Sequence, residues 1–484
     1  MRAYEPVIGL EIHCQLLTAS KIFCGCSTRF GAAPNTQVCP VCLGLPGALP
    51  VLNHAAVDLA VRAALALGCT VHERSIFARK NYFYPDLPKG YQISQYELPL
   101  ATGGLVPAGS DYWTPPYDIR VTRLHMEEDA GKLLHEGFPD SARKSYVDLN
   151  RAGTPLVEIV TEPDFRSAKD AAAFFAYLRE LVVAIGVNDG NMEEGSLRCD
   201  ANVSVRPAGS DTLGTKTEIK NLNSFRFLEE AIAAEIGRQV SALEAGQRIV
   251  QETRLWDAAL GETVSMRSKE EAHDYRYFPE PDLPPLVVAP ERLRALEGAM
   301  PLLPAARRRR LQAMHGLAES DAVTLTLQGL DGYFEAAVGA GADAKAARNW
   351  LLGAVRAAMN DLGIDGVPAL EARLPPERLA GLLALVETGS ISGTIAKDVF
   401  AKMIASGRPA GEIVAAEGLA QIDDEGAIDA RIAEVLAANA DAVAQIALGK
   451  TGAFGFLVGQ VMKATGGKAN PKRVNERLRK ALES

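Results

Sequence analysis

Two side chains with metal-binding chemistry lie two residues apart near the start of the chain. Glu11 and His13 belong to an apolar run, residues 7–13, whose composition favours a β-strand. Side chains two apart in a strand point to the same face, so this carboxylate and imidazole converge, while Ile12 points to the other face. A carboxylate beside an imidazole can begin a divalent-metal site, although the pair alone is a weak signal.

Four cysteines follow at spacings typical of structural zinc sites. Cys24 and Cys26 form a Cys-x-Cys pair, and Cys39 and Cys42 form a Cys-x-x-Cys pair that leads into a glycine-bearing turn. Paired thiolates at these spacings match a tetrahedral zinc site, and four such residues are a strong signal. The sequence therefore predicts a zinc-binding segment over residues 24–42.

Two further acidic residues extend the Glu-x-His pair. Glu128 lies in the acidic segment after His125, where an extended chain would point these two side chains opposite ways. Glu158 interrupts an apolar strand, and because burying a bare carboxylate costs several kcal/mol, it must be paired, protonated or bound to a metal. Glu11, His13, Glu128 and Glu158 together suit Mg²⁺, which prefers oxygen ligands and accepts an occasional imidazole. The alternative is a set of ion pairs with nearby arginines.

A proline-punctuated segment rich in aromatic residues, residues 79–94, is the expected ligand-binding loop. The sequence contains no Walker loop, no Gly-x-Gly-x-x-Gly motif after a strand and no kinase signature, so a nucleotide site must be of another kind. A purely structural loop is the alternative. The polar start of a predicted strand near residue 198 supplies further candidate ligand-binding residues. The residues expected to bind nucleotide or substrate are Lys89, Tyr91, Ser94, Arg198 and Asp200.

The C-terminal segment is basic although the whole chain has a formal net charge of −9. Residues 450–484 carry eight Lys or Arg against two Glu, and screening limits the reach of distant charges to about 10 Å. Glycines and Asn470-Pro471 separate two short helices whose cations gather at the turn, as contact with a phosphodiester backbone requires. A basic helix cap is the alternative. The residues expected to contact such a backbone are Lys463, Lys468, Lys472 and Arg473.

Length and composition indicate a globular protein of about three domains. The 484 residues are 48% apolar and 23% charged, which excludes a disordered or fibrous chain. Alternating strands, interrupted by helices at about 54–68, 167–186 and 224–245, predict an α+β fold with a largely antiparallel sheet and flanking helices over residues 1–295. Beyond residue 295, Ala-, Leu- and Arg-rich sequence with helical spacing predicts two all-α domains, 296–415 and 416–484.

No segment reaches 18 uninterrupted apolar residues, and the N-terminus lacks the apolar core of a signal peptide. Seven cysteines, four of them in the zinc pattern, fit a reducing compartment. We therefore expect a cytoplasmic protein that does not contact a membrane.

The motifs taken together resemble the B subunits of glutamine-dependent aspartyl/glutamyl-tRNA amidotransferases. The similarity runs nearly end to end and includes the tail. The segments that carry it are residues 9–16, 39–53, 79–94, 125–132, 148–164, 192–206, 214–226, 266–286 and 458–478.

This resemblance implies a heterotrimer with an amidase A subunit and a small C subunit. It implies that the chain uses ATP to phosphorylate the side-chain carboxylate of Asp-tRNA(Asn) or Glu-tRNA(Gln), after which ammonia displaces the phosphate. An N-terminal cradle domain would hold this site, and the helical and tail domains would grip the tRNA. The family's Mg²⁺ ligands fall on Glu11, His13, Glu128 and Glu158, and its optional structural zinc falls on the four cysteines.

The source of ammonia must lie outside this chain. His13 and Cys14 are adjacent, hence on opposite strand faces, and do not form a Cys-His pair. Two other protein classes remain open at this point. A non-catalytic zinc-ribbon protein that binds RNA would explain the cysteines and the tail but not the carboxylates, and a hydrolytic metalloenzyme would need zinc at the Glu and His residues.

Overall fold

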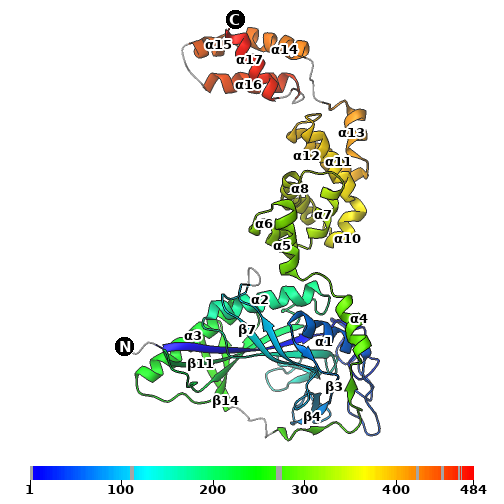
Figure 1. The fold of residues 1–484 in the computed structure, drawn as a ribbon, viewed down its shortest axis with the longest axis vertical. Coiled ribbons are helices and arrows are strands. Elements are labelled where there is room, and N and C mark those ends of the chain that lie inside the picture. Colours follow the sequence, from blue (N-terminus) through cyan, green and yellow to red (C-terminus); the bar gives the residue numbers. More distant parts are fainter. Residues whose placement is uncertain are drawn as a thin grey trace. The chain divides into compact units, whose positions relative to one another are not determined.

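The computed structural model describes residues 4–109, 114–268, 275–420, 425–447, 452–466, 469 and 471–483. The chain divides into two compact units, an N-terminal unit of residues 1–306 and a C-terminal unit of residues 307–484. The N-terminal unit combines a large sheet with helices and the C-terminal unit is helical, so the predicted α+β class is confirmed (Figure 1). The division of the helical region near residue 415 stays a prediction.

A nine-stranded sheet, counted over the described residues, forms the centre of the N-terminal unit. Every neighbouring pair is antiparallel except β12 and β13, which agrees with the prediction of a largely antiparallel sheet. In order across the sheet, the strands are β14 (Glu262–Ser268), β13 (Glu252–Asp257), β12 (Thr217–Leu222), β11 (Leu197–Pro207), β1 (Tyr4–Gln15), β10 (Pro155–Thr161), β7 (Ile119–Glu128), β6 (Ala101–Val106) and β2 (Thr70–Val71).

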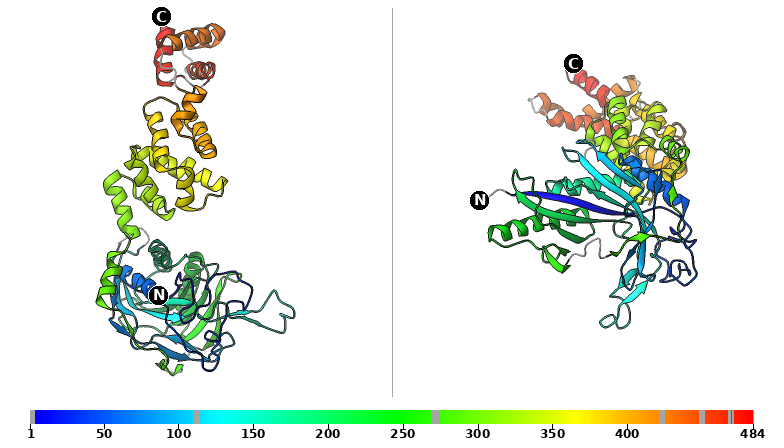
Figure 2. Two further views of the ribbon diagram at one scale, coloured as in Figure 1. Left: turned by 90° about the vertical axis from the view of Figure 1, so that its right-hand side faces the viewer. Right: turned by 60° about the horizontal axis from the view of Figure 1, so that its bottom comes forward.

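Three helices cover one face of this sheet: α1 (His54–Ala66), α2 (Ala168–Ala184) and α3 (Phe225–Glu244) (Figures 1 and 2). Each begins within one residue of its predicted start, after a side chain that accepts a hydrogen bond from a free backbone N–H of the first turn. These caps are Asn53, Ser167 and Ser224. Alternate residues of β1, from Ile8 to Cys14, pack against the helices, which leaves the intervening side chains on the other face.

Shorter strands lie along that other face. A three-stranded sheet is formed by β15 (Phe278–Pro279), β4 (Ala78–Asn81) and β5 (Tyr91–Ser94), and two-stranded sheets by β16 (Leu286–Val287) with β3 (Arg74–Ser75) and by β8 (Lys132–Leu134) with β9 (Tyr146–Asp148). The three-stranded sheet is fixed to the end of β7 because Gln92 donates a hydrogen bond to the backbone carbonyl of Glu128, at 2.7 Å. Helix α4 (Pro290–Gly298) packs against α1.

The C-terminal unit contains two separate hydrophobic clusters, one drawn from residues 311–414 and the other from residues 428–478. The first cluster is enclosed by α5 (Pro304–His315), α6 (Glu319–Leu327), α7 (Asp331–Gly339), α8 (Ala344–Trp350), the π-helical turn η2 (Leu351–Val355), α9 (Arg356–Asp361), α10 (Gly366–Arg373), α11 (Pro376–Glu387), α12 (Gly393–Ser406) and α13 (Ala410–Glu417). The second is enclosed by α14 (Glu425–Ala438), α15 (Ala440–Ala447), α16 (Gly452–Ala464) and α17 (Pro471–Glu483). None of the described helices combines the length and hydropathy that crossing a bilayer requires.

The pairing of β1 with β10 depends on one threonine side chain. The backbone register continues as far as Glu11 opposite Val160, and β10 has an irregularity immediately after Val160. The buried hydroxyl of Thr161 there accepts a hydrogen bond from the backbone N–H of Leu10, at 2.9 Å. This side chain therefore replaces a missing backbone partner at the irregularity, before the chain pairs with β1 again at Ile8 and Phe165.

We predict that Thr161→Val lowers the free energy of unfolding of the N-terminal unit by about 1–3 kcal/mol, because it leaves the N–H of Leu10 buried and unpaired. Urea unfolding followed by circular dichroism measures the change. Thr122→Val, which removes an exposed hydroxyl bonded to Glu162, is the control and should stay within about 0.5 kcal/mol of the wild type. Equal losses in the two variants would contradict the role of Thr161.

Candidate active site and four-cysteine cluster

Strand register places four polar side chains in one row across the sheet face opposite the helices. His125 of β7 pairs with Glu158 of β10, Glu158 pairs with His13 of β1, and His13 pairs with Arg198 of β11. Directly opposed residues have Cβ atoms about 5 Å apart and point to the same side. The row therefore joins residues that lie up to 185 positions apart in the sequence into one polar surface.

A group suited to a divalent ion lies along this row. The Nε2 atom of His13 is 3.6 Å from a Glu158 oxygen and 3.8 Å from a Glu127 oxygen. One ligand atom from each of these three residues lies within 4.8 Å of the others, and we call His13, Glu127 and Glu158 the His–Glu cluster. Two carboxylates and one imidazole leave positions for water and phosphate oxygens, as Mg²⁺ prefers.

The cluster contains Glu127 instead of the neighbouring Glu128. Successive strand residues point to opposite faces, so Glu127 shares its face with His125, whereas Glu128 does not. One oxygen of Glu128 accepts a hydrogen bond from the backbone N–H of Ile93 at 2.8 Å and is paired with Lys89. The structure thus brings His13 and Glu158 of the predicted magnesium set together and places Glu128 outside their group. Sequence analysis passed over Glu127, although the two-residue spacing from His125 marks it.

Glu11, the fourth residue of the predicted set, lies one pairing step from His13 on the same face. It is opposite Asp200 of β11, and one of its oxygens accepts a hydrogen bond from Asn202 at 2.9 Å. The Asp200 carboxylate in turn accepts a hydrogen bond from Lys220 at 2.6 Å. Burial opposes the charge of Lys220, but the adjacent carboxylates of Asp200 and Glu218 outweigh burial and raise the pKa of Lys220. Glu11 is therefore part of a second acidic group beside the His–Glu cluster.

The Glu158 carboxylate is stabilised in its ionised form. Burial opposes ionisation, but the imidazoles of His125 and His13 outweigh it and hold the pKa of Glu158 well below its usual value. Lys80, on β4, contributes to this effect. Burial opposes the charge of Lys80 as well, yet Tyr277 and the carboxylates of Glu127 and Glu158 raise the pKa of Lys80, so one cation faces the cluster from the smaller sheet.

The structure does not bring together all five residues that were predicted to bind nucleotide or substrate. Lys89 and Tyr91 lie beside Glu128 in a cavity of about 90 Å³. Ser94 donates a hydrogen bond to Glu127 at 3.2 Å, and Arg198 contacts both oxygens of the buried Asp129 at 3.0 Å, while Asp200 belongs to the second acidic group.

Asp129 is a further residue that sequence analysis did not select. Burial opposes its ionisation, but Arg198 and Arg151 outweigh burial and lower the pKa of Asp129. The side-chain amide of Gln15 donates a hydrogen bond to the Asp129 carboxylate at 2.7 Å. This ion-pair group anchors the end of β7, from which Glu127 projects, to β1 and β11.

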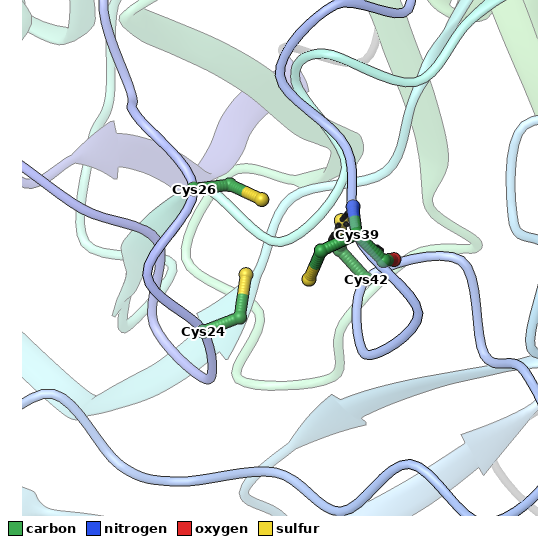
Figure 3. Close-up of side chains that lie close together, drawn as sticks. All are labelled: Cys24, Cys26, Cys39 and Cys42. Atoms are coloured by element: carbon green, nitrogen blue, oxygen red, sulfur yellow. Dashed lines mark hydrogen bonds between the residues drawn. The ribbon is translucent and has the colours of Figure 1, made fainter.

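The four cysteines form the other cluster of potential metal ligands in the described residues. Cys24 and Cys26 lie on one loop and Cys39 and Cys42 on a facing loop, with their sulfur atoms converging (Figure 3). The Sγ atoms of Cys39 and Cys42 are 3.9 Å apart. A tetrahedral zinc site with bonds of about 2.3 Å places its sulfur atoms about 3.8 Å apart, so this donor set fits zinc.

One thiol of the cluster, that of Cys42, is stabilised in its ionised form. A hydrogen bond from the Cys24 thiol outweighs burial and, with the cation of Lys21, lowers the pKa of Cys42. The backbone N–H of Cys39 donates to the Cys42 sulfur at 3.2 Å. All three contacts stabilise the Cys42 thiolate, which is the form that binds metal.

Comparison with known proteins identifies the family. The GatB/GatE catalytic domain model matches residues 6–294, and the GatB domain model matches residues 332–482. The B subunit of the aspartyl/glutamyl-tRNA(Asn/Gln) amidotransferase from Geobacter sulfurreducens is 55% identical over 481 residues, covering 99% of both chains. The corresponding B subunit from Burkholderia multivorans is 55% identical over 494 residues, covering 99% of both chains, and that from Myxococcus xanthus is 52% identical over 482 residues, covering 99% of this chain and 98% of its own.

The chain belongs to this family of amidotransferase B subunits. The resemblance inferred from the motifs is thereby confirmed, and no observation favours a zinc-ribbon protein without catalytic activity.

The tail of this B-subunit chain contains three of its four predicted tRNA-binding residues within the described part. Lys463 is exposed in the last turn of α16, and Lys472 and Arg473 belong to the first turn of α17, with Arg473 half-buried. Lys468 lies outside the described residues.

The alternation of β7 generates a direct test of the ligand set. We predict that Glu127→Gln and Glu158→Gln each weaken Mn²⁺ binding about tenfold or more, because each removes a charged oxygen ligand. Glu128→Gln is the matched control and should leave the affinity within about twofold. Electron paramagnetic resonance of free Mn²⁺ measures the three affinities. A weaker affinity for Glu128→Gln than for Glu127→Gln would contradict the assignment.

Proposed function

We propose that this chain phosphorylates the side-chain carboxylate of misacylated Asp-tRNA(Asn), Glu-tRNA(Gln) or both with ATP, and then converts it to the amide with ammonia. The observation that carries the proposal is the His–Glu cluster on the polar sheet face of a chain that belongs to the amidotransferase B-subunit family. His13, Glu127 and Glu158 would hold Mg²⁺. When bound, this ion would neutralise charge on the phosphates of ATP.

The residues around the cluster suit phosphoryl transfer to a carboxylate. A substrate carboxylate is already ionised at neutral pH and needs orientation more than deprotonation, so no general base is required for the first step. Lys80 brings a positive charge close to Glu127 and Glu158, where it would attract the negatively charged carboxylate and phosphate groups. Arg198 is held in place by Asp129 and would bring a positive charge to the other end of the row, opposite His13. The contribution of the protein is therefore to bind and orient charged groups.

Ammonia would come from a glutaminase, the amidase A subunit, in a heterotrimer that also contains a small C subunit. The only cysteine next to the cluster in the sequence supports this division of labour. Cys14 is fully buried among apolar side chains, whereas His13 points to the polar face, so the two do not form a nucleophile–base pair.

We propose a structural role for zinc at Cys24, Cys26, Cys39 and Cys42, since these residues lie on two loops beside the sheet and not in the His–Glu cluster. We also propose that the protein acts in the cytoplasm, where aminoacylated tRNA is available.

The helical region would bind the tRNA, and residues 416–484 would act as a tail domain of their own. The separate hydrophobic cluster of residues 428–478 supports an independent domain. The cations around the turn between α16 and α17, with Lys463, Lys468, Lys472 and Arg473 as the candidates, would contact phosphates.

The proposed chemistry is tested by amidation assays in the assembled heterotrimer with misacylated tRNA, ATP and glutamine. Glu158→Gln should lower the rate of amide formation about 100-fold or more, because a positioned charge is lost where phosphate charge develops. Binding of tRNA should stay within about twofold. Glu162→Gln neutralises a nearby carboxylate outside the cluster and serves as the control. Wild-type turnover in Glu158→Gln would refute the proposed site.

The proposed tail function is tested by deleting residues 416–484. We predict a weaker affinity for tRNA and a shallower dependence of the affinity on salt concentration, because phosphate contacts release counterions. Filter binding at several salt concentrations measures both quantities. An unchanged salt slope would show that the tail does not contact phosphates.

A further inference from the structure

Lys21, next to the four-cysteine cluster, is a fully buried lysine with a relative exposure of 0%. A buried ammonium group costs several kcal/mol unless an anion compensates it. Among the residues that the structure describes, no carboxylate forms an ion pair with Lys21, whose polar contacts are three other acceptors. The compensating negative charge must therefore come from one of those three acceptors.

The three acceptors match the three N–H groups of an ammonium. The Nζ atom of Lys21 lies 2.8 Å from the backbone oxygen of Gln37, 3.3 Å from the backbone oxygen of Leu149 and 3.6 Å from the sulfur of Cys42. Of these three atoms, only the Cys42 sulfur can carry a full negative charge. The contact with Cys42 is therefore the one that makes the buried cation tolerable.

We propose that Lys21 is the counter-cation of a metal-bound thiolate cluster, and that it ties this cluster to the chain segment that leads into β10. The inference rests on the proposed zinc site. Four thiolates and one Zn²⁺ carry a net charge of −2, and Lys21 compensates part of it inside the protein. Lys21 and the thiolate cluster then depend on each other, because the thiolates supply the negative charge that the buried ammonium needs and Lys21 offsets part of the cluster's excess negative charge.

The second half of the proposal concerns the hydrogen bonds beyond Lys21. The Leu149 carbonyl that Lys21 holds begins a loop, residues 149–154, that runs directly into β10 and its Glu158. The backbone N–H of Ile22 donates to the Gly153 carbonyl, and the N–H of Gly153 donates to the Asp129 carbonyl, each at 2.9 Å. Lys21 and Ile22 therefore connect the cysteine loops to the start of β10, which carries Glu158, and to the end of β7, which carries Glu127.

The space beside Lys21 supports this connection. A cavity of about 90 Å³ is lined by Lys21, Cys24 and Cys42 and also by Lys89 and Glu128. The cysteine cluster and the end of β7 therefore border the same cavity. Lys21 is a positioning residue in this account, since it acts through Cys42 and Leu149 and does not touch the substrate.

The test compares Lys21→Met with wild type in the full-length chain, using zinc release to a chromogenic chelator. Lys21→Met keeps the length of the side chain and removes its charge, and we expect zinc to leave about tenfold faster or more. Lys144→Met removes an exposed lysine that pairs with Asp140 and should release zinc at the wild-type rate. Equal release rates in Lys21→Met and wild type would overturn the proposal.

A spectroscopic measurement separates a charge effect from a packing effect. In cobalt-substituted protein, loss of the cation near Cys42 should move the thiolate-to-cobalt absorption to longer wavelength, because the thiolate holds its electrons less tightly. A mere packing defect would leave the band in place. An unchanged band in a folded Lys21→Met protein therefore contradicts the role of Lys21 as counter-cation.

A third measurement does not depend on the variant folding. When zinc is removed from wild-type protein, amide hydrogen exchange should rise at residues 22 and 153 and stay unchanged in α2 and α3. Unaltered exchange at residues 22 and 153 would overturn the coupling to β10. Wild-type protein purified without any zinc would instead refute the zinc site on which the inference rests, while leaving the amidation proposal intact.

Discussion

An ionised carboxylate in the middle of a protein sheet requires compensation, and Glu158 receives it from both sides and from above. His13 and His125 flank it on the neighbouring strands, and Lys80 approaches from the smaller sheet. Glu127 shares these neighbours, since its two oxygens lie 3.8 Å from the Nε2 atoms of His13 and His125, so two carboxylates lie close together where a divalent ion can bind both. The strands of the N-terminal unit thus supply the charged neighbours that keep the Glu158 carboxylate ionised.

Both ends of the strand that carries Glu158 are anchored by specific contacts. At its C-terminal end the hydroxyl of Thr161 pairs with the backbone of Leu10. At its N-terminal end the preceding loop is bonded to Asp129, to Ile22 and to the buried Lys21. Since a shift of one residue would turn Glu158 to the opposite face, such anchors preserve the site as well as the fold. The segment of Lys21 and Ile22, which leads into the cysteine loops, therefore helps to fix the start of this strand.

Local patterns were sufficient for the parts of this structure that depend on local rules. The apolar alternation around His13, the paired cysteines and the helix starts near residues 167 and 224 are all properties of short segments. The spacing from His125 puts Glu127 on the same strand face as that imidazole, but local rules do not say that this is the face that carries the site. That depends on which face of β7 packs against the helices, and therefore on the tertiary structure.

Lys80 and Lys21 illustrate a second limit of sequence reasoning. Neither lysine stands out in the sequence. The role of each depends on partners far along the chain, such as Glu158 for Lys80 and Leu149 for Lys21. A fully buried lysine such as Lys21 is rare enough that its partners are informative, but burial itself is visible only in the folded protein.

The central claim is that the His–Glu cluster holds one divalent ion. Crystals grown with Mn²⁺ and an ATP analogue test it most directly. Anomalous scattering at the manganese edge should give a peak within about 2.5 Å of His13 Nε2 and of oxygens from Glu127 and Glu158. A peak bound by Glu128, or by Glu11 and Asp200 without His13, would contradict the account.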